Sequence, residues 1–159
     1  MKALRLLFVT ALWVTLCTSI YSCSKDDNPE QESGNLIEQY SLLLYGSWYR
    51  ESNSELSKSF MNYKFSSNKS VVRYTKNAVR EKATIGGIVS YSDWRVNNEY
   101  STAGIWYIER KYERNYLEIQ WDGNDFYSGY PISYLNSNLL NIDDGFSSDL
   151  NKGEKSPNF

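Results

Sequence analysis

The sequence predicts an all-β protein, an up-and-down antiparallel β-barrel of about eight strands. Segments that alternate apolar and polar residues, or that are rich in β-branched and aromatic residues, recur from residue 46 onward. Turn signals separate these segments about every ten residues, a spacing typical of β-sandwiches and barrels. The hairpin-like connections favour an up-and-down order, and closure of the sheet would remove the exposed edges that an open sheet carries.

The first half of the domain begins with helical spacing and then changes to strand patterns. Apolar residues within 35–44 recur with a helical period and predict a short helix that leads into the domain. The first strand begins at Gly46. Residues 61–65 alternate apolar and polar, and the β-branched run 70–75 returns after a polar turn. The charged segment 77–82 predicts a loop.

The second half contains three further strand regions. Residues 85–96 include two adjacent glycines and predict either one bent strand or two short strands. Residues 105–110 and 116–121 predict a hairpin, and Leu117, Ile119 and Trp121 share one face of its second arm. The remaining strands are expected at 130–135 and 139–142. Beyond them the chain is polar and is expected to fray.

The first 23 residues have the features of a secretory signal. Lys2 and Arg5 give a positive start, residues 6–16 are apolar, and small and hydroxylated residues lead to Cys23. An uncleaved membrane helix is the first alternative, but the apolar run is about half the ~20 residues that a bilayer span needs. Cleavage without lipidation is the second. It would leave Cys23 as an unpaired cysteine, because Cys17 departs with the signal.

The residues around Cys23 resemble two known export motifs. Ile20-Tyr21-Ser22-Cys23 is similar to the lipobox of bacterial lipoproteins, which implies permanent anchoring on Cys23 by acyl chains such as palmitate. Ser24-Lys25-Asp26-Asp27 resembles the signal by which Bacteroidota send lipoproteins to the cell surface. These resemblances imply a protein of the outer membrane, held by its lipid and displayed on the surface.

The composition of the mature chain excludes several classes of function. Removal of residues 1–22 leaves 137 residues, 15 basic and 19 acidic, with a formal charge of −4. Nucleic acid is therefore not an expected partner. The sequence has no histidine, and lipidation of Cys23 would leave no free thiol. Ser-His-Asp and Cys-His catalysis are excluded, and most transition-metal sites are disfavoured. We expect a protein that is not an enzyme and has no cofactor and no metal.

We divide the chain into four regions on these patterns. The signal peptide occupies 1–22, and the lipidated cysteine with a flexible polar tether occupies 23–38. The barrel domain occupies 39–145, and a polar tail occupies 146–159. A domain of this length can build a single hydrophobic core.

Three segments of the domain resemble the short lipocalin-like lipoproteins of Bacteroidota. Gly46-Ser47-Trp48 is similar to the Gly-x-Trp motif that opens the first strand of lipocalins. Tyr63–Ser70 resembles the second hairpin of the short family, and Tyr130–Ile142 resembles its last two strands. The likeness covers about residues 40–145 and implies a lipocalin-like barrel. Trp48 is then expected to be a buried plug at the closed end of that barrel.

The aromatic residues are the main candidates for ligand contacts. Fourteen tyrosines and five tryptophans are more than a small core commonly uses. Large rings that fill a narrow barrel are the simpler explanation. In the alternative, some rings line an open mouth that stacks a sugar or encloses an apolar ligand. The candidate ligand-binding residues are Tyr91, Trp94, Trp106, Tyr107, Trp121 and Tyr134.

Acidic clusters on the second half of the domain are interpreted as structural. Asp122-Gly123-Asn124-Asp125 lacks the closing glutamate of a calcium loop and predicts a solvated turn. Asp143-Asp144-Gly145 likewise predicts a turn. Glu109, Glu113 and Glu118 lie among basic residues, so surface ion pairs are a simpler explanation than a glycosidase pair.

Two functions remain after these exclusions. The first is non-catalytic binding of a small apolar or glycan-like ligand by a lipid-anchored envelope protein. The alternative is a structural or accessory subunit that docks on an outer-membrane protein complex through exposed aromatic residues. The barrel interior distinguishes them, because an open cavity of several hundred Å³ favours the binder and a filled interior favours the accessory subunit.

Overall fold

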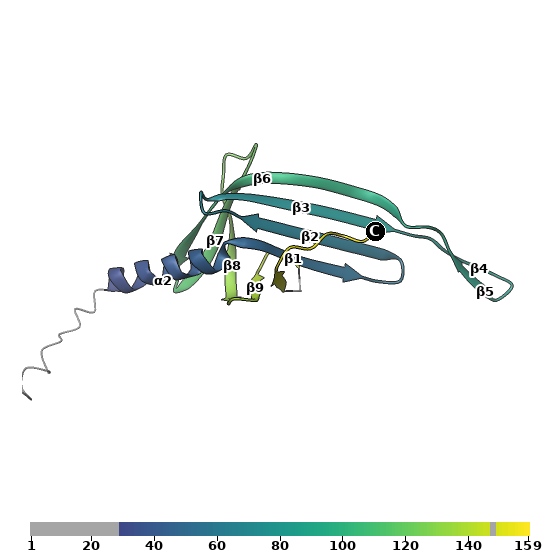
Figure 1. Ribbon diagram of the computed structural model, residues 1–159, viewed down its shortest axis with the longest axis horizontal. Coiled ribbons are helices and arrows are strands. Elements are labelled where there is room, and N and C mark those ends of the chain that lie inside the picture. Colours follow the sequence, from purple (N-terminus) through teal and green to yellow (C-terminus); the bar gives the residue numbers. More distant parts are fainter. Residues whose placement is uncertain (1–28, 147–148) are drawn as a thin grey trace, which may run out of the picture. The chain divides into compact units, whose positions relative to one another are not determined.

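The computed structural model describes residues 29–146 and 149–159, and the fold described below is that of the compact unit Ser33–Phe159. The signal peptide and Cys23 lie outside the described residues. The elements are α2 (Pro29–Leu44), β1 (Gly46–Asn53), β2 (Ser57–Phe65), β3 (Ser70–Val79), β4 (Lys82–Ile85), β5 (Ile88–Tyr91), β6 (Arg95–Lys111), β7 (Arg114–Trp121), β8 (Ser128–Leu135), β9 (Leu139–Ile142) and β10 (Leu150–Lys152) (Figure 1).

Eight of these strands form a closed antiparallel barrel in the order β1-β10-β9-β8-β7-β6-β3-β2. Each strand pairs with its neighbour in the chain, apart from an inserted hairpin, and β10 closes the ring against β1 through the pairs Trp48–Lys152 and Tyr49–Asn151. Strands β4 and β5 are the insertion and form a separate two-stranded sheet between β3 and β6. The predicted all-β, up-and-down barrel is confirmed.

Helix α2 confirms the predicted helix within 35–44 and begins earlier than expected. It starts at Pro29, whose fixed backbone angle suits the first helical position, so it takes in residues 29–38 of the segment predicted to be a flexible tether. Leu44 at its last position is fully buried, and Ile37 and Tyr40 pack against the barrel core. This apolar face holds the segment as a helix where polar composition alone predicted a coil.

The predicted boundary of the barrel at residue 145 is wrong. Strand β10 lies within the segment predicted to be a polar tail, and its Leu150 is fully buried in the core. Lys152 pairs with Trp48 on β1, and the next amide, of Gly153, donates to the Ser47 carbonyl over 2.9 Å. Three residues are too few to show a period-two pattern, so local sequence did not reveal this strand.

The region from 77 to 96 also differs in part from the prediction. Strand β3 continues to Val79, because its backbone pairs with both β2 and β6 along this length and Ala78 is buried. Of the two alternatives for 85–96, two short strands are nearer to the structure, in which β4 ends at Ile85, β5 spans Ile88–Tyr91 and the long strand β6 begins at Arg95. Gly86 and Gly87 form the turn of the β4–β5 hairpin with φ of 58° and 80°, values that favour glycine.

Aromatic side chains make up much of the core of the closed barrel. Trp48 is fully buried, as predicted, and its indole Nε1 donates to the Leu44 carbonyl over 2.6 Å, which ties α2 to β1. Tyr63 and Phe65 on β2 stack with ring centroids 5.8 Å apart, and Phe65 meets Trp106 edge-on at 5.5 Å. The core is therefore packed with rings, which agrees with the simpler explanation of the aromatic excess.

Candidate functional site

A buried ion pair lies at the inner face of the barrel. Arg50 lies two residues after Trp48 and points to the same inner face. Its guanidinium binds the Asp144 carboxylate, with 3.0 Å between Nη1 and Oδ1, and the Asp144 side chain is only 3% exposed. The Tyr63 hydroxyl donates to the same carboxylate over 3.3 Å, and burial raises the pKa of Tyr63. Asp144 does lie in a bend, as predicted, but its role as a buried partner of Arg50 was not predicted.

The space beside this pair is small. A cavity of about 30 Å³ lies between Arg50, Met61 and Phe146, and the Phe146 ring lies 4.1 Å from the guanidinium carbon of Arg50. That volume suits about one water molecule. A site of this size does not hold a small organic ligand, and the neighbouring core is filled with rings.

Two of the six predicted ligand-binding residues are core residues. Trp106 and Trp121 are buried within the barrel, and the Trp106 indole donates to the Ser70 carbonyl over 3.1 Å. Trp121 shares its face with Leu117 and Ile119, which are both fully buried. These two tryptophans therefore stabilise the barrel and do not line an open mouth.

The other four predicted residues lie on different parts of the surface. Tyr107 is on the outer wall, where its ring meets Tyr127 at 5.0 Å. The Tyr134 hydroxyl binds the Asp149 carboxylate just before β10. Tyr91 and Trp94 lie on and after the β4–β5 hairpin. The structure does not bring the six residues to one site.

The acidic residues of the β6–β7 hairpin differ in part from the prediction of surface ion pairs, because Glu118 is buried. The Lys111 Nζ lies 2.9 Å from a Glu109 carboxylate oxygen and 3.0 Å from one of Glu118, and hydrogen bonds to these two groups raise the pKa of Lys111. Residues 122–125 form an exposed turn. In the part of the chain that the structure describes, no group of three or more Asp, Glu, His or Cys side chains is arranged to hold a metal ion.

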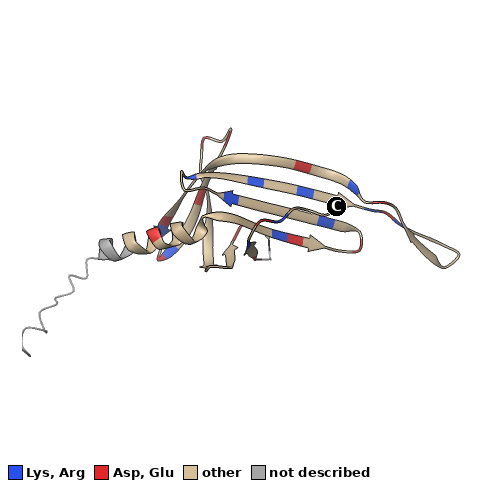
Figure 2. Cartoon of the chain, viewed as in Figure 1, with Lys and Arg blue, Asp and Glu red and all other residues tan. Residues whose placement is uncertain are grey.

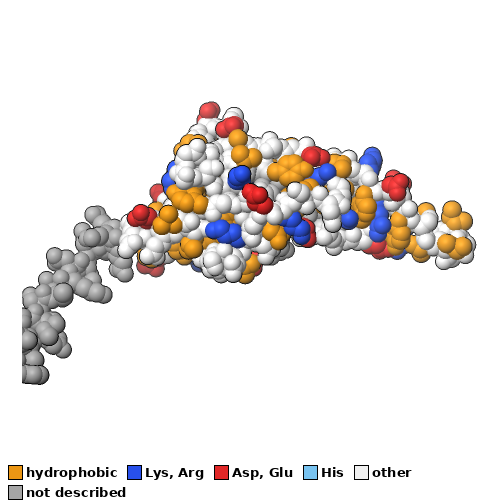
Figure 3. Space-filling view, in the orientation of Figure 1, with side chains coloured by type: hydrophobic (Ala, Val, Ile, Leu, Met, Phe, Trp, Pro, Cys, Tyr) orange, Lys and Arg blue, Asp and Glu red, His pale blue; other side chains and the backbone are white. Residues whose placement is uncertain are grey.

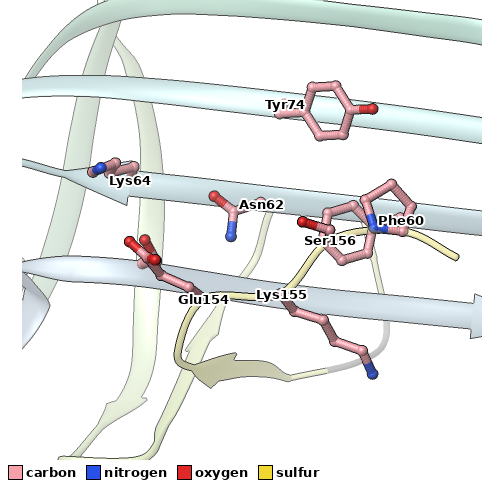
Figure 4. Close-up of a pocket in the computed structure, with 9 residues that line it drawn as sticks. Phe60, Asn62, Lys64, Tyr74, Glu154, Lys155 and Ser156 are labelled. Atoms are coloured by element: carbon pink, nitrogen blue, oxygen red, sulfur yellow. The ribbon is translucent and has the colours of Figure 1, made fainter.

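A groove of about 570 Å³ lies on the outer wall of the barrel, between the C-terminal segment 153–159 and strands β1–β3 (Figure 4). The lining residues are Ser47, Phe60, Asn62, Lys64, Tyr74, Glu154, Lys155, Ser156 and Pro157. Sequence analysis missed this groove because it forms only when the tail lies back on the barrel. A tail predicted to fray gives no signal of such a site.

Specific contacts hold the C-terminal segment against the wall. The Lys155 Nζ lies 2.8 Å from a Glu51 carboxylate oxygen and 5.2 Å from the centre of the Tyr49 ring. At the chain end, the Phe159 ring lies 5.5 Å from the Lys58 Nζ. The segment therefore contacts the barrel both near β10 and at its last residue.

A second feature, the β4–β5 hairpin, presents apolar side chains to solvent. Ile85 and Ile88 face each other across the turn and are 79% and 75% exposed, and Val89 is 47% exposed. Figure 3 shows apolar surface at the end of the molecule formed by the hairpin. At its base, the Arg80 guanidinium carbon lies 4.3 Å from the Tyr91 ring centre and 4.6 Å from that of Trp94.

Comparison with known proteins does not assign a role to the groove or to the β4–β5 hairpin. No family model, curated protein or solved structure matches this chain. The lipocalin-like family therefore stays a prediction, and the functional argument depends on the groove and the hairpin themselves. Among the described residues, no helix is both long and apolar enough to cross a membrane.

Proposed function

We propose that this protein is a lipid-anchored, non-catalytic accessory subunit of the outer membrane that binds a partner protein through its β4–β5 hairpin. The exposed apolar residues of that hairpin carry the proposal, since solvent-exposed isoleucines at neighbouring positions favour an interaction site. The packing of the barrel core supports it, because the cavity beside Arg50 and Met61 has about 30 Å³, far less than the several hundred Å³ of a small-molecule site.

The edges of the hairpin indicate how a partner would bind. Strands β4 and β5 pair only with each other, so each has one edge of unpaired backbone groups. Proteins normally protect such edges with charged residues, proline or bulges. Strand β4 carries Lys82, but β5, Ile88-Val89-Ser90-Tyr91, has no charged residue and no proline (Figure 2). A strand from the partner would pair with β5, and pockets beside that strand would receive Ile88 and Val89.

The position of the hairpin favours a protein partner over the anchoring membrane. Leu44 of α2 and the start of β1 lie at one end of the barrel, where Gly46 pairs with Phe65. The hairpin follows the far end of β3, where Val79 pairs with Ser57. The chain that leads toward Cys23 thus enters the barrel at the end opposite to the hairpin. Unpaired strand edges are also unfavourable in hydrocarbon.

Site-specific photocrosslinking in intact cells tests the hairpin. A photoreactive residue in place of Ile88 should give a discrete crosslinked product, because this side chain would be covered by the partner. The same residue in place of Tyr112, which is 92% exposed on the β6–β7 turn, is the matched control and should give none. Absence of a product at Ile88, or equal products at both positions, would contradict docking through the hairpin.

The anchor is tested by metabolic labelling with palmitate. Cys23→Ala should abolish the label and leave an uncleaved precursor, since the proposed attachment atom is the Cys23 sulfur. Cys17→Ala is the control and should keep the label, because Cys17 lies within the predicted signal. Label that persists in Cys23→Ala would remove Cys23 as the attachment point without affecting the docking proposal.

A further inference from the structure

We infer that the groove beneath the C-terminal segment is a binding site for a short, uncharged glycan of one or two sugar rings. This site is on the outer wall of the barrel and is separate from both the barrel interior and the β4–β5 hairpin. Its volume of about 570 Å³ lies within the range of small-molecule sites. The inference therefore concerns a second binding activity, independent of docking.

Polar groups with no partner in the structure line this groove. Asn62 and Lys64 project from β2 on the same outer face, and Glu154 and Ser156 lie on the C-terminal segment that passes beside them (Figure 4). Among the described residues, these four side chains make no hydrogen bond or ion pair with one another or with other side chains. An amide, an ammonium, a carboxylate and a hydroxyl are thus free to bind the hydroxyl groups of a ligand.

The charges of the lining favour an uncharged ligand. Lys64 and Glu154 contribute one positive and one negative charge, and the third charged residue, Lys155, is neutralised by Glu51. A carboxylate or phosphate ligand would meet the uncompensated Glu154 carboxylate, and a cation would meet Lys64. Sugar hydroxyls donate to carboxylates and accept from ammonium and amide groups, so they use both charges.

The groove also has a fixed apolar surface. Phe60 lies in its wall, only 1% exposed and stacked on Tyr49 with ring centroids 6.4 Å apart, so the apolar surface open to a ligand comes from Tyr74 and Pro157. The Tyr74 hydroxyl donates to Glu99 over 2.7 Å, which holds the ring in place, and burial together with this bond raises the pKa of Tyr74 to about 12. Pro157 lies on the tail side. A sugar ring has an apolar C–H face and polar hydroxyl edges, which matches this combination of rings and polar groups.

Calorimetric titration of the full-length protein tests this inference. The protein is kept in a detergent without a sugar headgroup, and the probes are chitobiose, lactose, maltose and mannobiose. At least one disaccharide should bind with a Kd of about 1 mM or tighter. Asn62→Ala and Glu154→Gln should each weaken binding about tenfold, because the first removes an amide from the groove and the second replaces a charged acceptor of sugar hydroxyls by a neutral amide.

The control is Glu113→Gln, which makes the same change to an exposed carboxylate on the β6–β7 turn and should leave the Kd unchanged. Failure of all four disaccharides to bind would overturn the inference. Equal affinity of the wild type and both groove variants would also overturn it, because the sugar would then bind elsewhere. Ile88→Asn should leave sugar binding intact, so this result and the crosslinking result are independent.

Discussion

Replacement of Trp48 by alanine is expected to lower the free energy of unfolding by about 3–5 kcal/mol. The Trp48 side chain has 0% exposure and lies where α2 meets the first strand of the barrel. Its loss would leave a cavity in a core already packed with rings, and the surrounding strands can collapse only in part. The Leu44 carbonyl would also lose the indole N–H that it accepts over 2.6 Å. Urea denaturation followed by circular dichroism measures the change.

Trp94→Ala is the matched control for this experiment. Trp94 lies between β5 and β6, and its contacts are with the side chains of Lys58 and Arg80, at 4.7 and 4.6 Å. Exposed cation–π contacts of this kind contribute about 0.5–1 kcal/mol, so the expected loss is several times smaller than for Trp48. Equal losses in the two variants would show that the Trp48 ring does not organise the core.

The packing of Trp48, Trp106 and Trp121 illustrates what local sequence can predict. The Gly46-Ser47-Trp48 motif indicated a buried ring at the start of the first strand, and the structure places it there. Trp121 alternates with Leu117 and Ile119, and this pattern already puts the three side chains on one face. Followed to its conclusion, the pattern also argues against Trp121 as a ligand contact, because a face shared with two aliphatic residues faces the core.

The structural features that sequence analysis did not predict depend on contacts between residues far apart in the chain. Strand β10 has three residues, and only its pairing with β1 and β9 identifies it. The groove needs the tail to lie across β1–β3, so no single segment carries its pattern. Two short strands were one of the alternatives for residues 85–96, but their pairing as the β4–β5 hairpin was not predicted. Its exposure could not be predicted, because alternation does not tell whether anything packs on either face.

Asp144 shows the same limit for a charged residue. Its neighbours Asp143 and Gly145 are typical of a turn, and the structure has a bend there. Arg50, however, occupies an inward position two residues after Trp48, and a buried guanidinium requires an acidic partner. This need for a carboxylate is visible only once the strand is known to face inward at Arg50, and 94 residues separate it from Asp144, with several other acids available.

Asp144→Ala is expected to destabilise the protein by about 3–5 kcal/mol, the cost typical of removing one member of a buried ion pair. The two side chains are only 6% and 3% exposed, so the Arg50 charge would remain in the barrel without this carboxylate. The Tyr63 hydroxyl would also lose an acceptor at 3.3 Å. Asp125→Ala is the control, because Asp125 lies in an exposed turn and should change stability by less than about 0.5 kcal/mol.

A double variant separates the ion pair from the packing around it. If the cost of Asp144→Ala arises from the uncompensated charge, then Arg50→Met combined with Asp144→Leu should recover part of the stability, since an apolar pair of similar volume often replaces a buried ion pair without loss. The free energies of unfolding of the wild type, Arg50→Met, Asp144→Leu and the double variant give the coupling between the two sites. Additive losses, or a loss for Asp144→Ala no larger than for Asp125→Ala, would show that the ion pair does not contribute to the stability of the barrel.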